Sequence, residues 1–164
     1  MSFRKIIILM VGVVFGTLSL LLALKFFKVG ELASNIISPS MPCHLYFIRY
    51  HIPAHIKRGT KILFYTPDLS PYYRAGMPFV KVIAGVPGDR VEKKGRCFYI
   101  NGKDAGCAVK FDLQGRKVSY LANLSGIIPE KHYFVLGKHP RSFDSRYWGY
   151  VKHDQIAGIA YCIF

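Results

Sequence analysis

The chain has 164 residues, a length that suits one folded domain with a small appendage and is short for a two-domain enzyme. Its 23 lysines and arginines outnumber its 9 aspartates and glutamates, so the formal net charge is +14 at pH 7. A nucleic-acid backbone and an anionic membrane surface both attract such a chain. However, the basic residues are scattered, and the sequence has no zinc-finger spacing, RNA-binding aromatic signature or helix-turn-helix pattern. These observations argue against nucleic acid as a partner.

Residues 6–24, IIILMVGVVFGTLSLLLAL, form an uncharged apolar run with basic residues on both sides. At about 1.5 Å per residue, a helix of this length reaches the ~30 Å thickness of a bilayer core. A cleaved signal peptide is the alternative, but its apolar region would be shorter, and KVGELASN is a poor cleavage site. We therefore expect residues 1–28 to be a retained membrane anchor, followed by an extracytoplasmic domain of residues 29–164. The balanced flanking charges leave the orientation open.

Beyond the anchor, runs of aromatic and β-branched residues alternate with turn residues, which is typical of short strands. The predicted strands are HLYFIRY, TKILFYT, PFVKVIAGV, DRVEKKG, CFYING, CAVKFDL, KVSYLA, HYFVLG and IAGIAYCIF. Asn101-Gly102 is expected to form a hairpin turn. No long amphipathic helical period competes with the strands. We predict a mainly β domain, either a sandwich or a partly open barrel, behind one N-terminal transmembrane helix.

The four cysteines are an even set without the C-x-x-C spacing of a metal site. Disulfides are permitted if the domain lies outside the cytoplasm. Cys97 and Cys107 flank the predicted hairpin, so they can face one another across it, whereas burial as plain thiols is the alternative. Cys43 with Cys162 is the remaining pairing.

The histidines give no sign of a metal site or of a classical hydrolase triad. His51 and His55 have helical spacing, but a proline lies between them and no third ligand is evident. His139 and Asp144 lie near one another, yet a Ser-His-Asp hydrolase would need a G-x-S-x-G elbow, which is absent. The sequence therefore predicts neither a metal nor a cofactor.

Lys81 is the only charged residue in the stretch AGMPFVKVIAGVP. Strand alternation puts Phe79 and Ile83 on the same face as this lysine. Val80 and Val82 fall on the opposite face. Most lysines of this kind extend their ammonium group to water. If the amine is instead desolvated, its pKa falls from about 10.4 towards 7 or 8, a change of roughly 4 kcal/mol that burial can supply, and such an amine can act as general base for a serine.

Four blocks of the sequence, taken in order, resemble those of the type I signal peptidases, which are membrane-anchored serine proteases with a Ser/Lys dyad. The blocks are Ser40-Met41-Pro42 after the anchor, KRGTKILFY, FVKVIAGVPGDRVE and YFVLGKHPRSFDSRYWGYV. They span about residues 38–151, most of the chain beyond the anchor. The resemblance implies an endopeptidase for exported precursors that uses no cofactor. It also implies a location in the inner (cytoplasmic) membrane, with the catalytic domain on the periplasmic side.

By this resemblance, Ser40 is the nucleophile and Lys81 is the general base that takes its proton. Ser38 matches the position whose hydroxyl joins the backbone N–H of Ser40 in an oxyanion hole. Pro39 between the two serines would stiffen this turn. Fixed donors aimed at a developing oxyanion are typically worth about 2.7 to 4 kcal/mol each.

The last block implies three supporting residues and departs from the family at one point. Ser142 matches a serine that orients the lysine, and Asp144 and Arg146 belong to the D-S-R-x-x-G ending. The family text G-D-N-R is replaced by LGKHPRS, so the family's acidic residue is missing. Its usual partner is a basic residue directly after the lysine, where this chain has Val82. Because both halves of the pair are absent, no orphan charge is left.

The wording of SMPCHLY and IAGVPGD is closer to the conjugative-transfer (TraF-type) branch of the family, whose members process pilin precursors and in some cases close the pilin into a ring. This implies a pilin precursor as substrate and type IV secretion or pilus-assembly components as partners. A housekeeping signal peptidase is the alternative within the family. A soluble self-cleaving repressor shares the dyad but normally lacks an anchor. A non-catalytic anchored β-domain of a secretion or pilus machine, with Ser40 and Lys81 as mere turn and core residues, is the alternative of another class.

Overall fold

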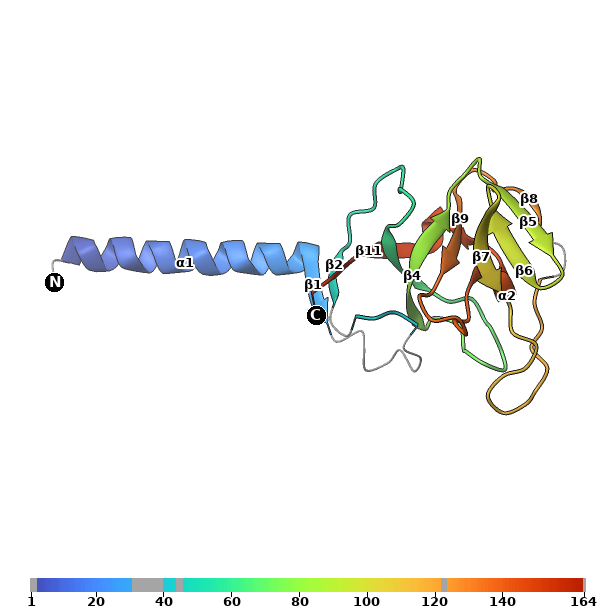
Figure 1. Cartoon of the computed structure of the whole chain (residues 1–164). Coiled ribbons are helices and arrows are strands. Elements are labelled where there is room, and N and C mark those ends of the chain that lie inside the picture. The colour runs from blue at the N-terminus through green and yellow to red at the C-terminus, as the bar shows by residue number, and fades with distance from the viewer. Residues whose placement is uncertain (1–2, 31–39, 44–45, 122–123, 164) are drawn as a thin grey trace.

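An N-terminal helix and a β domain make up the molecule (Figure 1). The structure is a computed structural model that describes residues 3–30, 40–43, 46–121 and 124–163. Helix α1 (Phe3–Phe26) extends away from the domain, and its side chains between residues 4 and 22 are exposed. The segment Arg4–Leu22 is long and apolar enough to cross a membrane, by length and composition. The predicted N-terminal apolar helix is therefore present.

Seven antiparallel strands form the larger sheet, in which β4 is an inner strand. In sheet order they are β1 (Phe27–Gly30), β2 (Tyr46–Arg49), β11 (Ile156–Cys162), β3 (Lys61–Tyr65), β4 (Pro78–Gly85), β9 (His132–Leu136) and β10 (Val151–Lys152). Lys81 lies in the middle of β4 and pairs with Ile62 of β3. Because β4 is paired with β3 on one side and β9 on the other, the backbone around Lys81 is shielded from water.

Four antiparallel strands form the smaller sheet, in the order β7 (Lys103–Cys107), β6 (Cys97–Ile100), β5 (Arg90–Lys94) and β8 (Gly126–Ile127). The predicted turn between β6 and β7 is confirmed, because Asn101 and Gly102 both have positive φ (50° and 77°). This is the backbone that a two-residue type I′ hairpin requires. The mainly β class with two antiparallel sheets is also as predicted.

Two of the predicted strands are wrong. CAVKFDL overlaps a strand only at Cys107, and KVSYLA only contributes to an isolated bridge between Lys117 and Phe111. The segment between them turns because the carboxylate of Asp112 accepts hydrogen bonds from the backbone N–H of Gln114 and Arg116. A side chain that bonds its own backbone in this way competes with strand pairing. The predicted runs do not include the short helices α2 (Ser145–Trp148) and η1 (His153–Gln155), the strands β1, β8 and β10, or β7 apart from Cys107.

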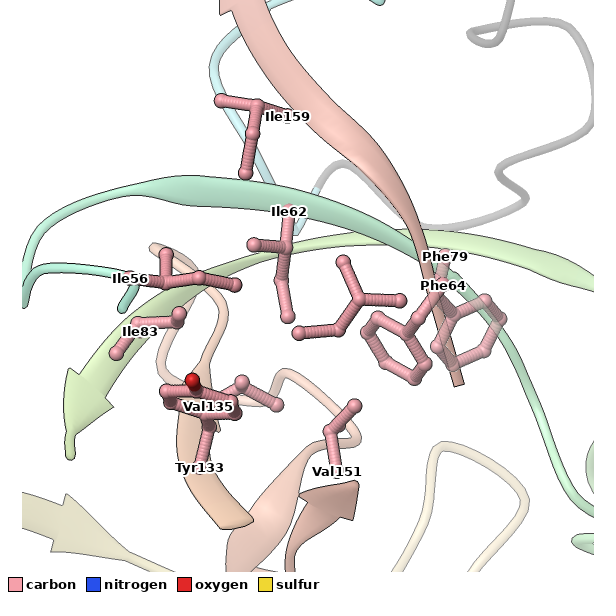
Figure 2. Close-up of a cluster of buried hydrophobic side chains, with 10 residues drawn as sticks. Ile56, Ile62, Phe64, Phe79, Ile83, Tyr133, Val135, Val151 and Ile159 are labelled. Carbon is pink, nitrogen blue, oxygen red and sulfur yellow. The ribbon is translucent and has the colours of Figure 1, made fainter. Parts of the chain in front are cut away.

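Three clusters of buried apolar side chains form the core around the two sheets. Figure 2 shows the cluster to which Phe79 and Ile83 contribute, together with Ile62 and Phe64 of β3. Val80 instead joins the cluster on the other face of the sheet, which also contains Tyr46, Ile48, Leu63, Met41 and Cys43. The predicted alternation along β4 is therefore confirmed, and it puts Lys81 on the face of Phe79, with Nζ 5.3 Å from the centre of that ring.

Both disulfides considered from the sequence are formed. Cys97 and Cys107 pair directly across β6 and β7, as the hairpin predicted. Cys43 and Cys162 join the segment that follows Ser40 to the end of β11. The second bridge closes a separation of 119 residues and fixes the Ser40 segment to the larger sheet.

Candidate active site

Ser40, Lys81 and Ser142 come from three distant parts of the chain and meet at one point. Ser40 precedes β2, Lys81 lies in β4, and Ser142 lies between β9 and α2. The Nζ of Lys81 is 2.8 Å from the Oγ of Ser40 and 2.8 Å from the Oγ of Ser142. Lys81 is 4% exposed, Ser40 is 2% exposed and Ser142 is 0% exposed. The amine therefore lies between two hydroxyls and is almost cut off from bulk water.

The backbone around Ser40 is held on both sides. The N–H groups of Lys138 and His139 both donate to the carbonyl oxygen of Ser40, at 3.2 Å for His139. Met41 and Cys43 are buried in the cluster behind β4. The hydroxyl of Ser40 is thus presented to Lys81 by a segment whose backbone and neighbours are fixed.

Gly137, directly after β9, leaves the room that the site needs. A Cβ atom added at this position would lie 2.0 Å from the Oγ of Ser142 and 3.1 Å from the Cβ of Ser40. The contact with Ser142 is too short for non-bonded atoms, and the contact with Ser40 is tight. Sequence reasoning did not single out Gly137; the available signal was a glycine just after a strand in the block that contains Ser142.

A buried ion pair supports Ser142. The carboxylate of Asp144 accepts from the Nε and Nη2 of Arg146, both at 2.8 Å, and from the backbone N–H of Gly137 at 3.1 Å. Arg146 also donates from Nη2 to the carbonyl oxygen of Ser142 and from Nη1 to that of Cys107, each at 3.2 Å. Asp144 and Arg146 are 0% and 4% exposed. The pair therefore ties the loop of Ser142 to β7 and to the start of α2.

Burial dominates the electrostatics of Lys81. It lowers the pKa of the amine to about 8, because the charged form loses its hydration. The carboxylate of Asp144 acts in the opposite direction, and the guanidinium of Arg146 again lowers the lysine pKa. With a pKa near 8, about a tenth of the amine is neutral at pH 7. This fraction can accept a proton from the hydroxyl of Ser40.

Val82 occupies the position where the resemblance expects a basic residue. Its side chain is half-buried against the cluster behind β4. An apolar contact thus replaces the acid–base pair there, in agreement with the missing acidic residue in LGKHPRS.

A cleft of about 640 Å³ adjoins the loop of Ser142. Its aromatic floor is built on Phe143, whose ring centroid lies 5.3 Å from that of Tyr72, 5.6 Å from that of Tyr73 and 5.1 Å from that of Tyr147. Arg141 also lines it. Phe143 directly follows Ser142, so the cleft and Ser142 share one loop, although Ser40, Lys81 and Ser142 do not line the cleft.

Ser38, possible metal ligands and Ser145 complete the description of the site. Ser38 lies outside the described residues. Among the described residues, no group of histidine, cysteine, aspartate or glutamate side chains could hold a metal ion. Ser145 was not predicted; its Oγ accepts from the backbone N–H of Val135 at 2.8 Å and so ties the start of α2 to β9.

A model of the family described as "Signal peptidase, peptidase S26" matches residues 2–164. The chain belongs to the S26 signal peptidase family. This membership agrees with the resemblance carried by the four sequence blocks.

Two proteins that are similar to this chain are named signal peptidases. Signal peptidase IB of Staphylococcus aureus is 30% identical over 117 residues, which cover 63% of this chain and 58% of that protein. The chain thus matches less than two thirds of that relative's length. A crystal structure of a signal peptidase I from Enterococcus faecalis V583 has 30% identity and a TM-score of 0.42, and the match covers 64% of this chain and 96% of that one. Neither name refers to conjugation, so the conjugative-transfer branch stays a prediction.

Proposed function

We propose that this chain is a membrane-anchored serine endopeptidase that cleaves exported precursor proteins. Ser40 is the nucleophile and Lys81 the general base. The observation that carries the proposal is the distance of 2.8 Å between the Nζ of Lys81 and the Oγ of Ser40, in surroundings that lower the lysine pKa to about 8. A hydroxyl is a weak nucleophile until a nearby base accepts its proton.

The residues act in a fixed order in this proposal. The neutral amine of Lys81 accepts the proton of the Ser40 hydroxyl while the Oγ attacks the scissile carbonyl carbon. The resulting ammonium then gives this proton to the leaving amine, so that the peptide bond breaks and an acyl-enzyme ester forms. Water, activated by the same amine, hydrolyses the ester and restores Ser40. By the family resemblance, Ser38 and the backbone N–H of Ser40 hold the oxyanion.

Ser142, Asp144 and Arg146 are positioning residues in this proposal. The hydroxyl of Ser142 fixes the direction of the Lys81 amine, so that its lone pair faces Ser40. The carbonyl of Ser142 is in turn held by Arg146, which is neutralised by Asp144. The cleft floored by Phe143 receives apolar side chains of the precursor.

The proposal includes an inner-membrane location with the β domain on the periplasmic side. The apolar helix and the S26 membership support an anchor, and both disulfides fit an oxidising compartment. Reporter fusions directly after α1 and at the carboxyl terminus test the orientation. A cytoplasmic carboxyl terminus would contradict it.

For the substrate we propose a conjugative pilin precursor, on the wording of SMPCHLY and IAGVPGD. Type IV secretion or pilus-assembly components would then be the partners. The S. aureus relative is named a signal peptidase, and this favours general preproteins as the second candidate. Mass spectrometry of the mature product separates the outcomes, because a linear chain has a free new terminus and a ring is lighter by one water.

The dyad is tested by expressing a precursor together with Ser40→Ala or Lys81→Met variants. Both variants should leave the precursor uncut. Ser125→Ala and Lys103→Met, which change the same residue types at exposed positions, should process it normally. Unimpaired processing by both dyad variants would exclude Ser/Lys catalysis by this protein. It would favour the alternative of a non-catalytic β-domain. That alternative also predicts that pilus assembly fails while the size of the precursor is independent of Ser40.

A further inference from the structure

A second cavity, of about 650 Å³, is lined by residues of β2, β3 and β11 and of the loop between β2 and β3. Its charged lining is entirely basic among the described residues: Arg49, Lys57 and Lys61, with His55 beside them. The remaining lining residues are uncharged and include Thr60 and Tyr161. We call this cavity the basic groove. Three basic side chains without a carboxylate form a site for an anion.

The basic groove lies directly beside the end of α1. Arg49 is the Cα partner of Phe27, the residue that follows α1, and on its other side it is the partner of Ile159. Paired residues of neighbouring antiparallel strands lie about 5 Å apart. In Figure 1 β2 and β11 run beside the base of the helix. If α1 crosses the bilayer, the groove opens where the helix leaves the lipid.

The cations of the groove are available for a ligand. The Nε of Arg49 is buried and has no hydrogen-bond partner among the described residues. A buried donor without an acceptor is costly, and an oxygen atom in the groove would satisfy it. The neighbouring Arg58 differs, because Asp89 already binds it at 2.6 Å. Arg49 also lies over the ring of Tyr161, 5.9 Å from its centre, and Tyr161 is one of the exposed aromatic residues on this side.

We propose that the basic groove binds the phosphate head group of an anionic phospholipid. The proposal rests on the membrane anchor of the proposed function but not on the Ser/Lys dyad. A phosphodiester offers acceptor oxygens to the guanidinium of Arg49 and charge to Lys57 and Lys61. Tyr161 supplies the amphipathic ring that suits the boundary between lipid and water. A lipid is favoured over a soluble anion because the groove lies at the end of a membrane-length helix, where anionic head groups are concentrated.

Native mass spectrometry of the full chain in detergent micelles tests this proposal. Phosphatidylglycerol and phosphatidylcholine are titrated in parallel, and the dissociation constant of each is measured. The test variant carries Arg49→Gln, Lys57→Gln and Lys61→Gln. The matched control removes the same number of charges at exposed positions away from the groove, through Lys94→Gln, Lys103→Gln and Lys110→Gln. Thermal unfolding verifies that each variant folds, and the exposed Lys57→Gln serves alone if the triple variant does not.

The wild type should bind phosphatidylglycerol more tightly than phosphatidylcholine. The groove variant should lose this preference, with affinity lower by about tenfold or more, while the matched control keeps it. Equal binding of the two lipids, or equal losses in both variants, would overturn the proposal. Displacement of phosphatidylglycerol by inorganic phosphate at equal concentration would assign the groove to a soluble anion instead. Ser40→Ala should bind the lipid like the wild type, so failure here is distinguishable from failure of the dyad.

Discussion

Two buried basic residues are both hydrogen-bonded to Ser142, but their other hydrogen-bond partners differ. Lys81 and Arg146 are each 4% exposed. Burial would lower the pKa of Arg146, but the hydrogen bonds and charge of Asp144 raise it. Lys81 has two serine hydroxyls as its hydrogen-bond partners, and its pKa is lowered to about 8. The partner, more than the burial, decides whether a cation serves structure or proton transfer.

The largest effect is expected from removing the unpaired cation. Lys81→Met should lower kcat/KM for a precursor peptide by about 10⁴-fold or more, because among the described residues only the amine of Lys81 is hydrogen-bonded to the hydroxyl of Ser40. The fold should be retained, since methionine fills a similar volume. Single-turnover cleavage measures the loss, and circular dichroism verifies the fold. An active Lys81→Met variant would mean that Lys81 is not the general base.

Breaking the ion pair should instead damage the fold. Arg146→Met leaves the carboxylate of Asp144 buried without its cation, and the free energy of unfolding should fall by about 3 to 5 kcal/mol. The pair of Arg116 and Asp112, in which the arginine is exposed, offers a control. Arg116→Met should cost less than about 1 kcal/mol in urea denaturation. Similar losses for both substitutions would show that burial of the pair is unimportant.

A smaller effect on activity is expected from a substitution at Gly137, which contacts Ser40 and Ser142 on one side and donates its N–H to Asp144. Gly137→Ala pushes a methyl group against the Oγ of Ser142 and so displaces the hydroxyl that orients Lys81. A displacement of about 1 Å typically costs about 10²-fold in rate. The matched control is Gly16→Ala, where nothing lies within 4 Å of the added methyl. The loss should appear mainly in kcat; an unchanged kcat would mean that Ser142 does not position the amine.

The smallest effect is a gain in stability. Because burial of the Lys81 amine is unfavourable, Lys81→Met should raise the free energy of unfolding at pH 7 by on the order of 1 to 3 kcal/mol. The folded pKa lies below the unfolded one, so between pH 8 and about 10.5 the unfolded state binds more protons and the wild type gains stability as the pH rises. The advantage of the variant should therefore shrink across this window. A constant difference in urea denaturation from pH 6 to 11 would contradict the lowered lysine pKa.

Much of this site could be predicted from the sequence because its signals are local and ordered. A lone lysine in an apolar strand and a serine after the apolar helix stand in blocks that resemble one family. Strand geometry predicts that Phe79, Lys81 and Ile83 share one face. The pair Asn101-Gly102 predicts a hairpin turn, because both residues tolerate the positive φ that a type I′ turn requires.

Other features depend on contacts that no local pattern encodes. The role of Gly137 arises only when the loop of Ser142 folds back onto Ser40. KDAGC has little strand propensity, and β7 forms because the hairpin turn and the bridge to Cys97 hold it beside β6. Residues 107–122 have the composition of strands, but Asp112 bonds the backbone of its own turn.

The pH at which the Lys81 amine loses its proton is the most direct test of its role as general base. The pKa of this group can be measured by NMR titration of ¹³C-labelled lysine side chains in the full-length protein, with Lys81→Met used to assign the resonance. The account predicts a midpoint near pH 8 and a kcat/KM that rises with pH through the same midpoint. A midpoint near 10.5, the ordinary value for lysine, would contradict it.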